Sequence, residues 1–282
     1  MTKKEILQEL ECFNNLIFEA EQHKYTLPST DIKFTSVSKL KAKYKKQVPW
    51  EHIKKAIAKR DKTTYELVDN SWKHKAFMGT SRGTYIHEYI EFMIDNLGFP
   101  KYDQGIFHMT PEELADYFTK MEAMRKIADK YLEHYKEYEH VGSEIRVYDR
   151  QLEVSGTLDK LCIHPTKGLM QKDYKTDKQF RRPEDEWKTK GYMEGPLAHL
   201  VDCELVVYSL QQLIYKLIIE KNTNIKIPTE NIHLIWIHPD NDTYEEIPIL
   251  DLEDEAREVL SIHFTNLEEK KKQLQLVKGI KF

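Results

Sequence analysis

Residues 156–175 read GTLDKLCIHPTKGLMQKDYK, and this stretch decides the fold. Residues 165–168 predict a turn, with a strand on either side of it. Because side chains alternate across a strand, Asp173 and Lys175 are expected to point to the same face. The turn can also bring Asp159 of the first strand close to Asp173 of the second. We therefore expect two carboxylates and one ammonium group to converge.

Two carboxylates at such a short distance repel each other unless a cation lies between them. The expected cation is Mg²⁺ or Mn²⁺, which leaves Lys175 free to act on a water molecule or a phosphate. These groups are the components of metal-assisted phosphodiester hydrolysis. Taken alone, the same residues also fit an ordinary ion pair on a surface hairpin, the commoner outcome for an isolated Asp-x-Lys. The remaining signals in the chain decide between the two interpretations.

The length of 282 residues fits one large domain, or one core with additions. Charged residues make up 32% of the chain, as is typical of a soluble protein. No apolar run approaches the roughly 20 residues that span a bilayer, and no secretory signal follows Met1. We therefore expect a cytoplasmic protein that does not enter a membrane. The three cysteines, Cys12, Cys162 and Cys203, are far apart. Their spacing favours reduced thiols over disulfides, a zinc site or an iron–sulfur cluster.

The pattern of apolar residues predicts a mixed α/β fold with the core order α-β-β-β-α-β and added helices at both ends. A capping box at Thr2 and Glu5 starts the first added helix. The other expected helices cover residues 81–97, 110–135, 200–220 and 251–276, and the expected strands cover residues 143–148, 152–163, 169–175 and 232–238. We divide the chain into a basic helical region (1–80), a core (81–240) and a C-terminal helix packed on the core (241–282).

Two further pairs of polar residues have helical spacing. His87 and Glu91 are four residues apart near the start of a helix, so they share one face. A histidine followed by a glutamate one turn later is a better ligand candidate than a lone helical histidine, which is usually structural. Gln211 and Tyr215 are one turn apart on an otherwise apolar helix and need polar partners if they are buried.

Positive charge gathers in two segments. Residues 33–62 contain eleven Lys or Arg and only two acids, with Lys45, Lys46 and Trp50 among them. Such a segment can bind backbone phosphates and stack on unpaired bases, although a solvated helix face is the commoner explanation. The second segment, between Thr176 and Gln211, is irregular up to residue 199 and contains Lys178, Arg181, Arg182, Trp187, Lys188 and Lys190. It fits a flap over a DNA strand and a surface loop without a role about equally well.

Four motifs follow one another in a recognisable order: G-x-x-x-H-x-x-x-E at residues 83–91, G-x-x-D at 156–159, D-Y-K-T at 173–176 and Q-x-x-x-Y at 211–215. This series resembles the RecB-like branch of the PD-(D/E)XK nuclease superfamily. The resemblance covers about residues 34–240. The chain is also similar to phage-type exonucleases and mitochondrial genome maintenance exonucleases of this superfamily, in which a segment like Ser36-Val37-Ser38 precedes the histidine helix.

The resemblance implies a role for each matching residue. Asp159 and Asp173 would bind the metal, with His87 as the extra ligand of the RecB-like branch and the Tyr174 carbonyl completing the sphere. Lys175 would orient or deprotonate the attacking water. The remaining roles fall to Glu144, which would help to position the metal or water, and to Gln211 and Tyr215, which would brace the site and contact DNA. Mg²⁺ suits such oxygen ligands and retains waters, and a second metal could clamp the leaving oxygen.

The sequence therefore favours a metal-dependent DNA nuclease, with an exonuclease on single-stranded or end-containing DNA as the first choice. A structure-specific or sequence-specific endonuclease is the alternative within the superfamily. From another class, a catalytically silent DNA-binding subunit of a recombination complex is a further alternative. The resemblance implies DNA repair, recombination or phage genome handling in a bacterial or phage-infected cell, with replication or recombination proteins as possible partners. The sequence predicts neither the oligomeric state nor the polarity of cleavage.

Overall fold

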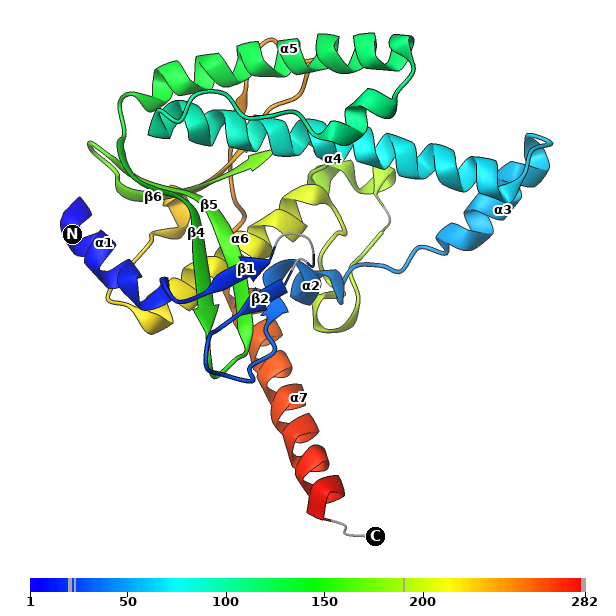
Figure 1. Ribbon diagram of the computed structural model, residues 1–282. Helices are drawn as coiled ribbons and strands as arrows, with labels where there is room; N and C mark the ends of the chain where they lie inside the picture. Colours follow the sequence, from blue (N-terminus) through cyan, green and yellow to red (C-terminus); the bar gives the residue numbers. More distant parts are fainter. Residues whose placement is uncertain (20–21, 23, 190, 280–282) are drawn as a thin grey trace.

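A mixed sheet forms the centre of the computed structural model, which describes residues 1–19, 22, 24–189 and 191–279 (Figure 1). Within these residues the sheet has six strands in the order β3-β5-β6-β7-β8, with β4 paired to β5. Their bounds are β3 (Thr35–Ser36), β4 (Glu139–Asp149), β5 (Val154–His164), β6 (Gly168–Lys175), β7 (Ile232–Trp236) and β8 (Glu245–Pro248). A separate small hairpin consists of β1 (Ile17–Glu19) and β2 (Lys24–Thr26).

Seven α-helices surround the sheet in the described part of the chain. They are α1 (Lys3–Leu10), α2 (Val37–Ala42), α3 (Trp50–Arg60), α4 (Tyr65–Asp95), α5 (Pro111–Tyr135), α6 (Glu204–Asn222) and α7 (Glu253–Gly279). Short 3₁₀ helices occur at Glu11–Phe13, Gln104–His108, Pro183–Lys188, Gly195–Leu197 and Thr229–Asn231.

Strand β5 organises the sheet. It is antiparallel to β4 along one edge and to β6 along the other, and β6 is in turn parallel to β7. The β5–β6 ladder starts at the turn with His164 opposite Gly168 and ends at Lys160 opposite Lys172. Beyond that point the edge of β5 pairs with β3 instead, through Val154. The two strands of the hairpin therefore separate directly before Asp159.

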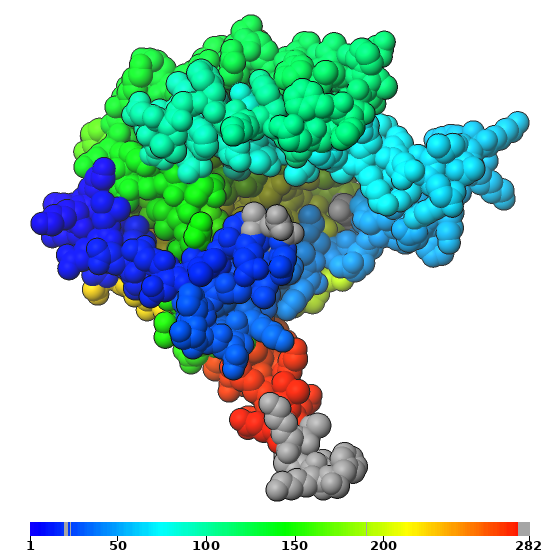
Figure 2. Space-filling view, viewed as in Figure 1, coloured from blue at the N-terminus to red at the C-terminus, as the bar shows by residue number. Residues whose placement is uncertain are grey.

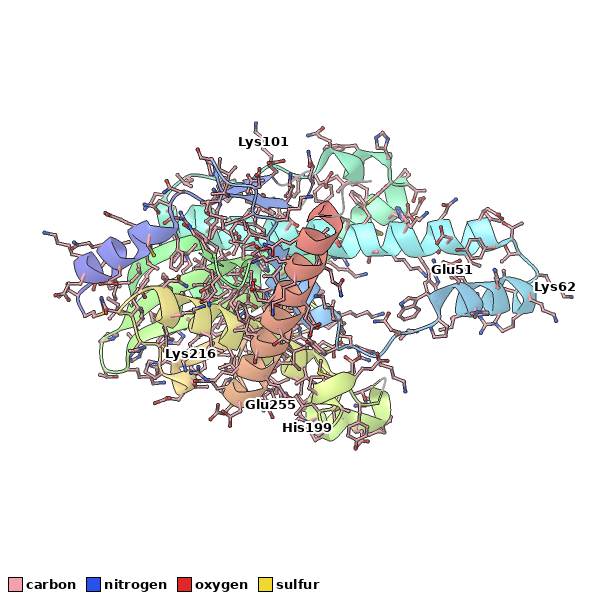
Figure 3. The ribbon with its side chains drawn as sticks, turned by 90° about the horizontal axis from the view of Figure 1, so that it is seen from below. Glu51, Lys62, Lys101, His199, Lys216 and Glu255 are labelled. Atoms are coloured by element: carbon pink, nitrogen blue, oxygen red, sulfur yellow. The ribbon has the colours of Figure 1, made fainter. Side chains whose placement is uncertain are left out.

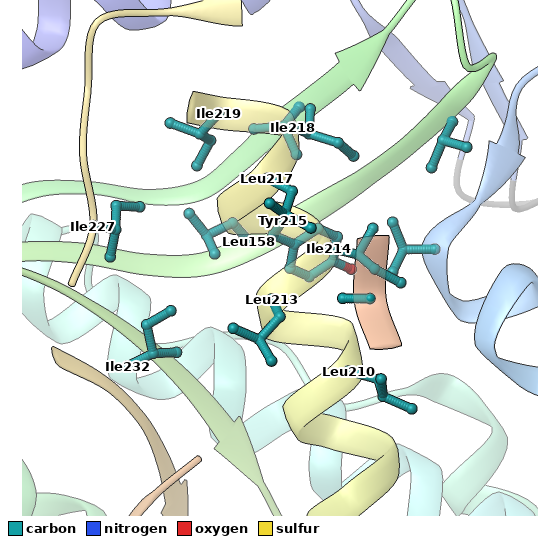
Figure 4. Packing of buried hydrophobic residues seen from close by; sticks show 14 of the residues in the cluster. Leu158, Leu210, Leu213, Ile214, Tyr215, Leu217, Ile218, Ile219, Ile227 and Ile232 are labelled. Carbon is teal, nitrogen blue, oxygen red and sulfur yellow. The ribbon is translucent and has the colours of Figure 1, made fainter. Parts of the chain in front are cut away.

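Two hydrophobic clusters cover the two faces of the sheet. On one face α6 is buried along nearly its whole length, and Figure 4 shows Leu210, Leu213 and Ile214 in one cluster with Leu158 of β5. Because α6 is apolar on nearly all sides, it needs neighbours around it, and α2 and α7 supply them. On the other face, α4 and α5 pack through a second cluster rich in tyrosine, which includes Tyr131 and Tyr174.

Helix α4 is much longer than the helix expected over residues 81–97. Its N-cap is Thr64, whose side chain accepts a hydrogen bond from the backbone N–H of Leu67 at 3.2 Å. It ends at Asn96, which has a left-handed φ of 56° that suits a helix C-terminus. The first half of α4 pairs with α3 in a helical hairpin that projects from the core, with Lys62 at its tip (Figures 1 and 3).

The first turns of α7 pack against α6 and form ion pairs with α6 and with the segment that precedes it. Leu252, Ala256 and Val259 are buried in the first cluster. Lys216 of α6 forms an ion pair with Glu253, and His199 Nε2 lies 3.1 Å from a carboxylate oxygen of Glu255 (Figure 3). The rest of α7 projects away from the body of the molecule (Figure 1).

The structure confirms the expected α/β class and the expected order of helix, three strands, helix and strand. The expected boundary at residues 80–81 falls inside α4, so it does not separate two structural units. The first 80 residues also contain three short strands and contribute Ile6 and Val37 to the main core. Among the described residues, no helix has the length and apolar character needed to cross a membrane.

Candidate active site

A cleft of about 940 Å³ opens between α4, the middle of β4 and β5, and the end of β6. In Figure 2 it is the hollow between the blue N-terminal segments and the cyan and green helices. Its lining includes residues that the sequence singled out, namely His87, Glu91, Glu144, Asp159 and Lys175. Three of the four sequence motifs therefore meet at one place, although they come from different elements.

Asp159 is positioned by the separation of β5 and β6. Its carboxylate Oδ2 accepts a hydrogen bond from the backbone N–H of Tyr174 at 2.8 Å. Asp159 lies one residue, and Tyr174 two residues, past the last pair of the ladder, Lys160 and Lys172. The Asp159 side chain thus accepts a hydrogen bond that a backbone carbonyl would accept in a continuous ladder. It is held where β5 and β6 separate. Burial, followed by the charge of Asp173, raises the pKa of Asp159 well above its ordinary value.

His87 approaches Asp159 from α4. Its Nδ1 lies 3.4 Å from Asp159 Oδ2. The approach depends on Gly83 one turn earlier, because a Cβ there would lie 2.7 Å from Thr176 Oγ1, on the residue that follows β6. Burial and then the charge of Lys175 lower the pKa of His87 to about 4. The imidazole is therefore neutral at pH 7, which is the form that binds metals.

Glu144 completes a group of three possible ligands. Its backbone has a left-handed φ of 47°, and the β4–β5 ladder skips the level of Glu144 and Asp159. Ligand atoms of His87, Glu144 and Asp159 all lie within 4.8 Å of one another. Glu144 reaches solvent at the cleft, yet burial of its inner side, followed by the charges of Glu91 and Asp173, raises its pKa to about 7.

This donor set fits a divalent cation. The raised pKa values of Asp159 and Glu144 show that the carboxylates lack enough positive charge nearby. A hard cation between them would remove that deficit, and carboxylate oxygens are the ligands that Mg²⁺ and Mn²⁺ prefer. Tyr174 also lines the cleft, and its carbonyl oxygen accepts a hydrogen bond from Lys175 Nζ at 3.2 Å.

Asp173 and Lys175 share a face of β6, as expected, and form an ion pair. Asp173 is 1% exposed and is not among the three groups that lie within 4.8 Å of one another. Burial opposes the charge of Lys175, but the carboxylates of Asp173 and Asp159 outweigh it and raise its pKa. The ammonium also lies 4.6 Å from the centre of the Tyr208 ring. Lys175 is thus a fixed positive charge directly beside the three possible ligands.

Lys41 is a residue of this region that the sequence did not single out. Its ammonium donates to Gln211 Oε1 and lies 4.7 Å from the centre of the Tyr208 ring, on the same ring that Lys175 approaches. Burial and the charge of Lys175 lower the pKa of Lys41 to about 7. The only sequence signal was its place in the basic segment, three residues after Ser38. Its contact with Gln211 joins positions 170 residues apart, which no local pattern reveals.

The expected DNA contact of Tyr215 is corrected by the structure. Tyr215 is 2% exposed, and its ring lies against Gly156, where a Cβ would be only 2.4 Å from the ring. Gln211 Nε2 donates to the Tyr215 hydroxyl at 3.2 Å and so links it to Lys41. Tyr215 therefore packs within the core against β5, whereas Gln211 is half-buried.

Both expected DNA-binding arginines form ion pairs with carboxylates. Arg181 binds both carboxylate oxygens of Glu204, and Arg182 pairs with Glu245. These ion pairs anchor the segment 176–203 to α6 and β8, so we correct their expected role from DNA contact to anchoring. Lys178 is exposed and lines the cleft. Lys190 lies outside the described residues.

The other expected DNA-contacting residues do not line the cleft. Lys45 and Lys46 occupy the connection from α2 to α3, where the Lys46 backbone N–H donates to Asp202 Oδ2 at 3.0 Å. Trp50 starts α3, is 47% exposed and lies 5.8 Å from the ring of Trp72 of α4.

In the comparisons with known proteins, no family model matches the sequence and no curated protein is significantly similar to it.

Proposed function

We propose that the protein is a metal-dependent DNA nuclease with a core like that of the RecB-like PD-(D/E)XK enzymes, and that it acts as an exonuclease on single-stranded or end-containing DNA. One observation carries the proposal. Ligand atoms of His87, Glu144 and Asp159 lie within 4.8 Å of one another, beside the ion pair of Asp173 and Lys175. An ordinary surface hairpin does not explain why a helix 70 residues upstream brings a neutral histidine to the same point.

Asp159, His87, Glu144 and the Tyr174 carbonyl would hold the metal, with Asp173 beside them. A bound Mg²⁺ or Mn²⁺ would supply an activated water and a positive charge for the phosphate oxygens. The expected hard ligands, together with one imidazole, suit either ion. In the described part of the chain, all three cysteines are free thiols, and Cys162 and Cys203 are buried.

Lys175 is the side chain that acts on the water and the phosphate. Its ammonium is held by Asp173 and the Tyr174 carbonyl, so its position is defined before a substrate arrives. In that position it orients a water and stabilises negative charge on a phosphate oxygen, an effect that is strongest in a partly buried site. Asp173 keeps Lys175 charged, because its carboxylate contributes to the raised pKa of the lysine.

A single strand fits the surroundings better than an intact duplex. The cleft is lined by Lys75 of α4 and by Lys178 of the segment that follows β6. The basic connection around Lys45 and Lys46 suits phosphate binding. The Trp50–Trp72 pair, in which Trp72 lies on α4 one turn before Lys75, suits base stacking. This part of the proposal sets the substrate, whereas the metal centre sets the reaction.

Digestion of labelled DNA tests the proposal. Linear single strands labelled at one end and closed circular single strands are incubated with Mg²⁺, Mn²⁺ or EDTA. The proteins are the wild type, Asp173→Ala and the control Asp251→Ala, which changes an exposed aspartate outside the cleft. We expect metal-dependent loss of the linear strand alone, in the wild type and the control but not in Asp173→Ala.

The other outcomes separate the alternatives. Cutting of the closed circles would replace the exonuclease with an endonuclease at the same site. DNA binding without cleavage of either substrate would favour a silent DNA-binding subunit. Normal cleavage by Asp173→Ala would show that the site assignment is wrong.

A further inference from the structure

A second cavity, of about 640 Å³, lies next to the cleft on the other side of α4. It is lined by α4, α5 and the segment that follows β7, including Arg82, Lys120 and His238. Four residues line both cavities: Lys75, Gly79, Thr176 and Lys178. The second cavity therefore adjoins the cleft that contains the candidate metal centre.

Three of the four Lys and Arg side chains that line this cavity lack a carboxylate partner among the described residues. Among the described residues, no carboxylate oxygen lies within 4.0 Å of the side-chain nitrogens of Lys75, Arg82 or Lys178. Arg82 is half-buried and contacts only the face of the Tyr117 ring, with 5.8 Å from the guanidinium carbon to the ring centre. Three unpaired cations around one cavity leave an excess of positive charge that suits an anion.

The two acids of the cavity do not neutralise this charge. Asp116 is already paired with Lys120 at 2.7 Å on the surface of α5. Asp240 is 81% exposed and lies 3.7 Å from Nδ1 of His238. Neither carboxylate therefore compensates Arg82 within ion-pair distance.

His238 lies where these charges converge. It is 9% exposed, and burial together with the charges of Arg82, Lys178 and Lys120 lowers its pKa. The backbone N–H of Asp240 donates to Nδ1 at 3.3 Å. Because Nδ1 is the acceptor, the neutral ring carries its proton on Nε2 and has a donor to offer. The cavity thus combines a guanidinium, two ammonium groups and a neutral N–H donor.

We propose that this second cavity binds a backbone phosphate of the nucleic-acid strand whose scissile phosphate lies at the metal centre, with Arg82 as its main contact. This inference rests on the proposed nuclease function for the identity of the strand. Lys75 and Lys178, which line both cavities, would contact the phosphates in between. The strand would then pass along α4 at Gly79 instead of ending at the metal centre.

The helix is shaped for such a passage at Gly79. A Cβ at Gly79 would meet no heavy atom within 4 Å, whereas a Cβ at Gly83 would be 2.7 Å from Thr176 Oγ1. The glycine at position 83 is therefore required by packing, but the glycine at position 79 is not. Glycine inside a helix costs about 0.5–1 kcal/mol of stability relative to alanine. Because packing does not require glycine at position 79, its presence there indicates that the space beside the helix is used.

Binding of single strands of increasing length, in EDTA to prevent cleavage, tests the proposal. Fluorescence anisotropy is measured for the wild type, Arg82→Gln, Gly79→Leu and the control Arg150→Gln. Arg150 is a matched control because it lies 6.0 Å from the centre of the Tyr148 ring and lines neither cavity. We expect Arg82→Gln to weaken binding of long strands about tenfold, as for one lost charge-assisted hydrogen bond. Its salt slope should fall by about 0.7.

Short strands distinguish the second cavity from the first. Strands too short to reach it should bind equally to the wild type and Arg82→Gln, and Gly79→Leu should abolish the gain in affinity with length. Gly79→Ala is included in case the larger side chain prevents folding, and it should reduce that gain in part. Equal losses for Arg82→Gln and Arg150→Gln, or a loss that is independent of length, would overturn the proposal.

Competition with inorganic phosphate and with a mononucleotide identifies the source of the phosphate. We expect millimolar concentrations of either to compete weakly with a long strand. Saturable binding of inorganic phosphate that depends on Arg82, with no effect of Arg82→Gln on strands, would overturn the strand passage. If the wild type does not cleave DNA with metal, yet Arg82→Gln shows the length-dependent loss, the nuclease proposal fails and the phosphate site stands.

Discussion

The carboxylate of Asp159 accepts a hydrogen bond from the backbone N–H of Tyr174 at 2.8 Å, where β5 and β6 cease to pair. This contact joins the two halves of the candidate metal centre. It fixes Asp159 relative to the Tyr174 carbonyl, and the next side chain along β6 is Lys175. The hairpin therefore positions a ligand, a carbonyl oxygen and an ammonium group through one local feature, namely the separation of its two strands.

Lys175→Met should remove most of the cleavage rate and leave DNA binding nearly unchanged. The ammonium stabilises charge that develops on the phosphate, so its loss is expected to lower the single-turnover rate roughly a hundred- to a thousandfold. Single-turnover cleavage with saturating protein measures this. A rate within a factor of about three of the wild type would remove Lys175 from the catalytic group.

Gly156→Ala should destabilise the protein through Tyr215. The new Cβ would lie 2.4 Å from the Tyr215 ring, which is buried and cannot turn away freely. We expect a loss of about 1–3 kcal/mol in the free energy of unfolding, measured by urea denaturation. The double variant Gly156→Ala with Tyr215→Leu should recover part of this loss, because the smaller side chain leaves room.

Gly79→Ala is the matched control for that substitution. Its Cβ meets no atom within 4 Å, and alanine favours the helix, so stability should rise by about 0.5–1 kcal/mol. If Gly156→Ala is as stable as Gly79→Ala, the close packing of Tyr215 on β5 is not as the structure has it.

Glu246 makes stability depend on acid pH. Burial alone would raise its pKa, but the hydrogen bond from His233 and the charge of Lys172 outweigh burial and lower the pKa to about 2. Because the folded pKa lies below the ordinary value of 4.5, the contribution is present above pH 4.5 and is lost as the pH falls toward 2. Urea denaturation between pH 7 and pH 3 should show this loss.

Glu246→Gln should cost about 3 kcal/mol at pH 7, because it leaves the fully buried Lys172 without its anion. The difference between this variant and the wild type should shrink at pH 3. Glu245→Gln is the control, since Glu245 forms an exposed pair with Arg182 that is worth less than about 1 kcal/mol. A constant difference at all pH values would refute the assigned ion pair.

Neutralising Lys45 and Lys46 together should reduce the salt dependence of single-strand binding. Each lysine that contacts a phosphate adds about 0.7 to the slope of log affinity against log salt, so the double Gln variant should lose about 1.4. The control replaces Lys270 and Lys272, which are exposed on the projecting part of α7. Equal slopes for both double variants would remove this segment from the DNA-binding surface.

The elements with a clear period were predictable from the sequence. The hairpin of residues 154–175 and the shared face of Asp173 and Lys175 followed from alternation alone, and the two capping boxes marked the starts of α1 and α5. Strands β1, β2, β3 and β8 were missed because strands of two to four residues contain too few side chains to show a period. The first half of α4 was missed because it lies beside α3, away from the core that imposes a regular apolar face.

The arrangement of the site was predictable only in part. The spacing of His87 and Glu91 indicated a shared helix face, but their position against Asp159 depends on the packing of Gly83 on Thr176. The pairing of Arg181 with Glu204 reversed the expected role of that arginine, because a carboxylate 23 residues away occupies it. Contacts between distant segments, like that of Lys41 with Gln211, have no signature in the local sequence.

Binding of Mn²⁺ in the absence of DNA tests the central claim most directly. Calorimetric titration of the wild type, Asp159→Asn and the exposed control Asp251→Asn compares the site with a neutral change elsewhere. We predict saturable binding by the wild type and the control and its loss in Asp159→Asn, because a neutral amide cannot replace the central carboxylate. Unchanged Mn²⁺ binding by Asp159→Asn would contradict the metal centre and, with it, the proposed nuclease.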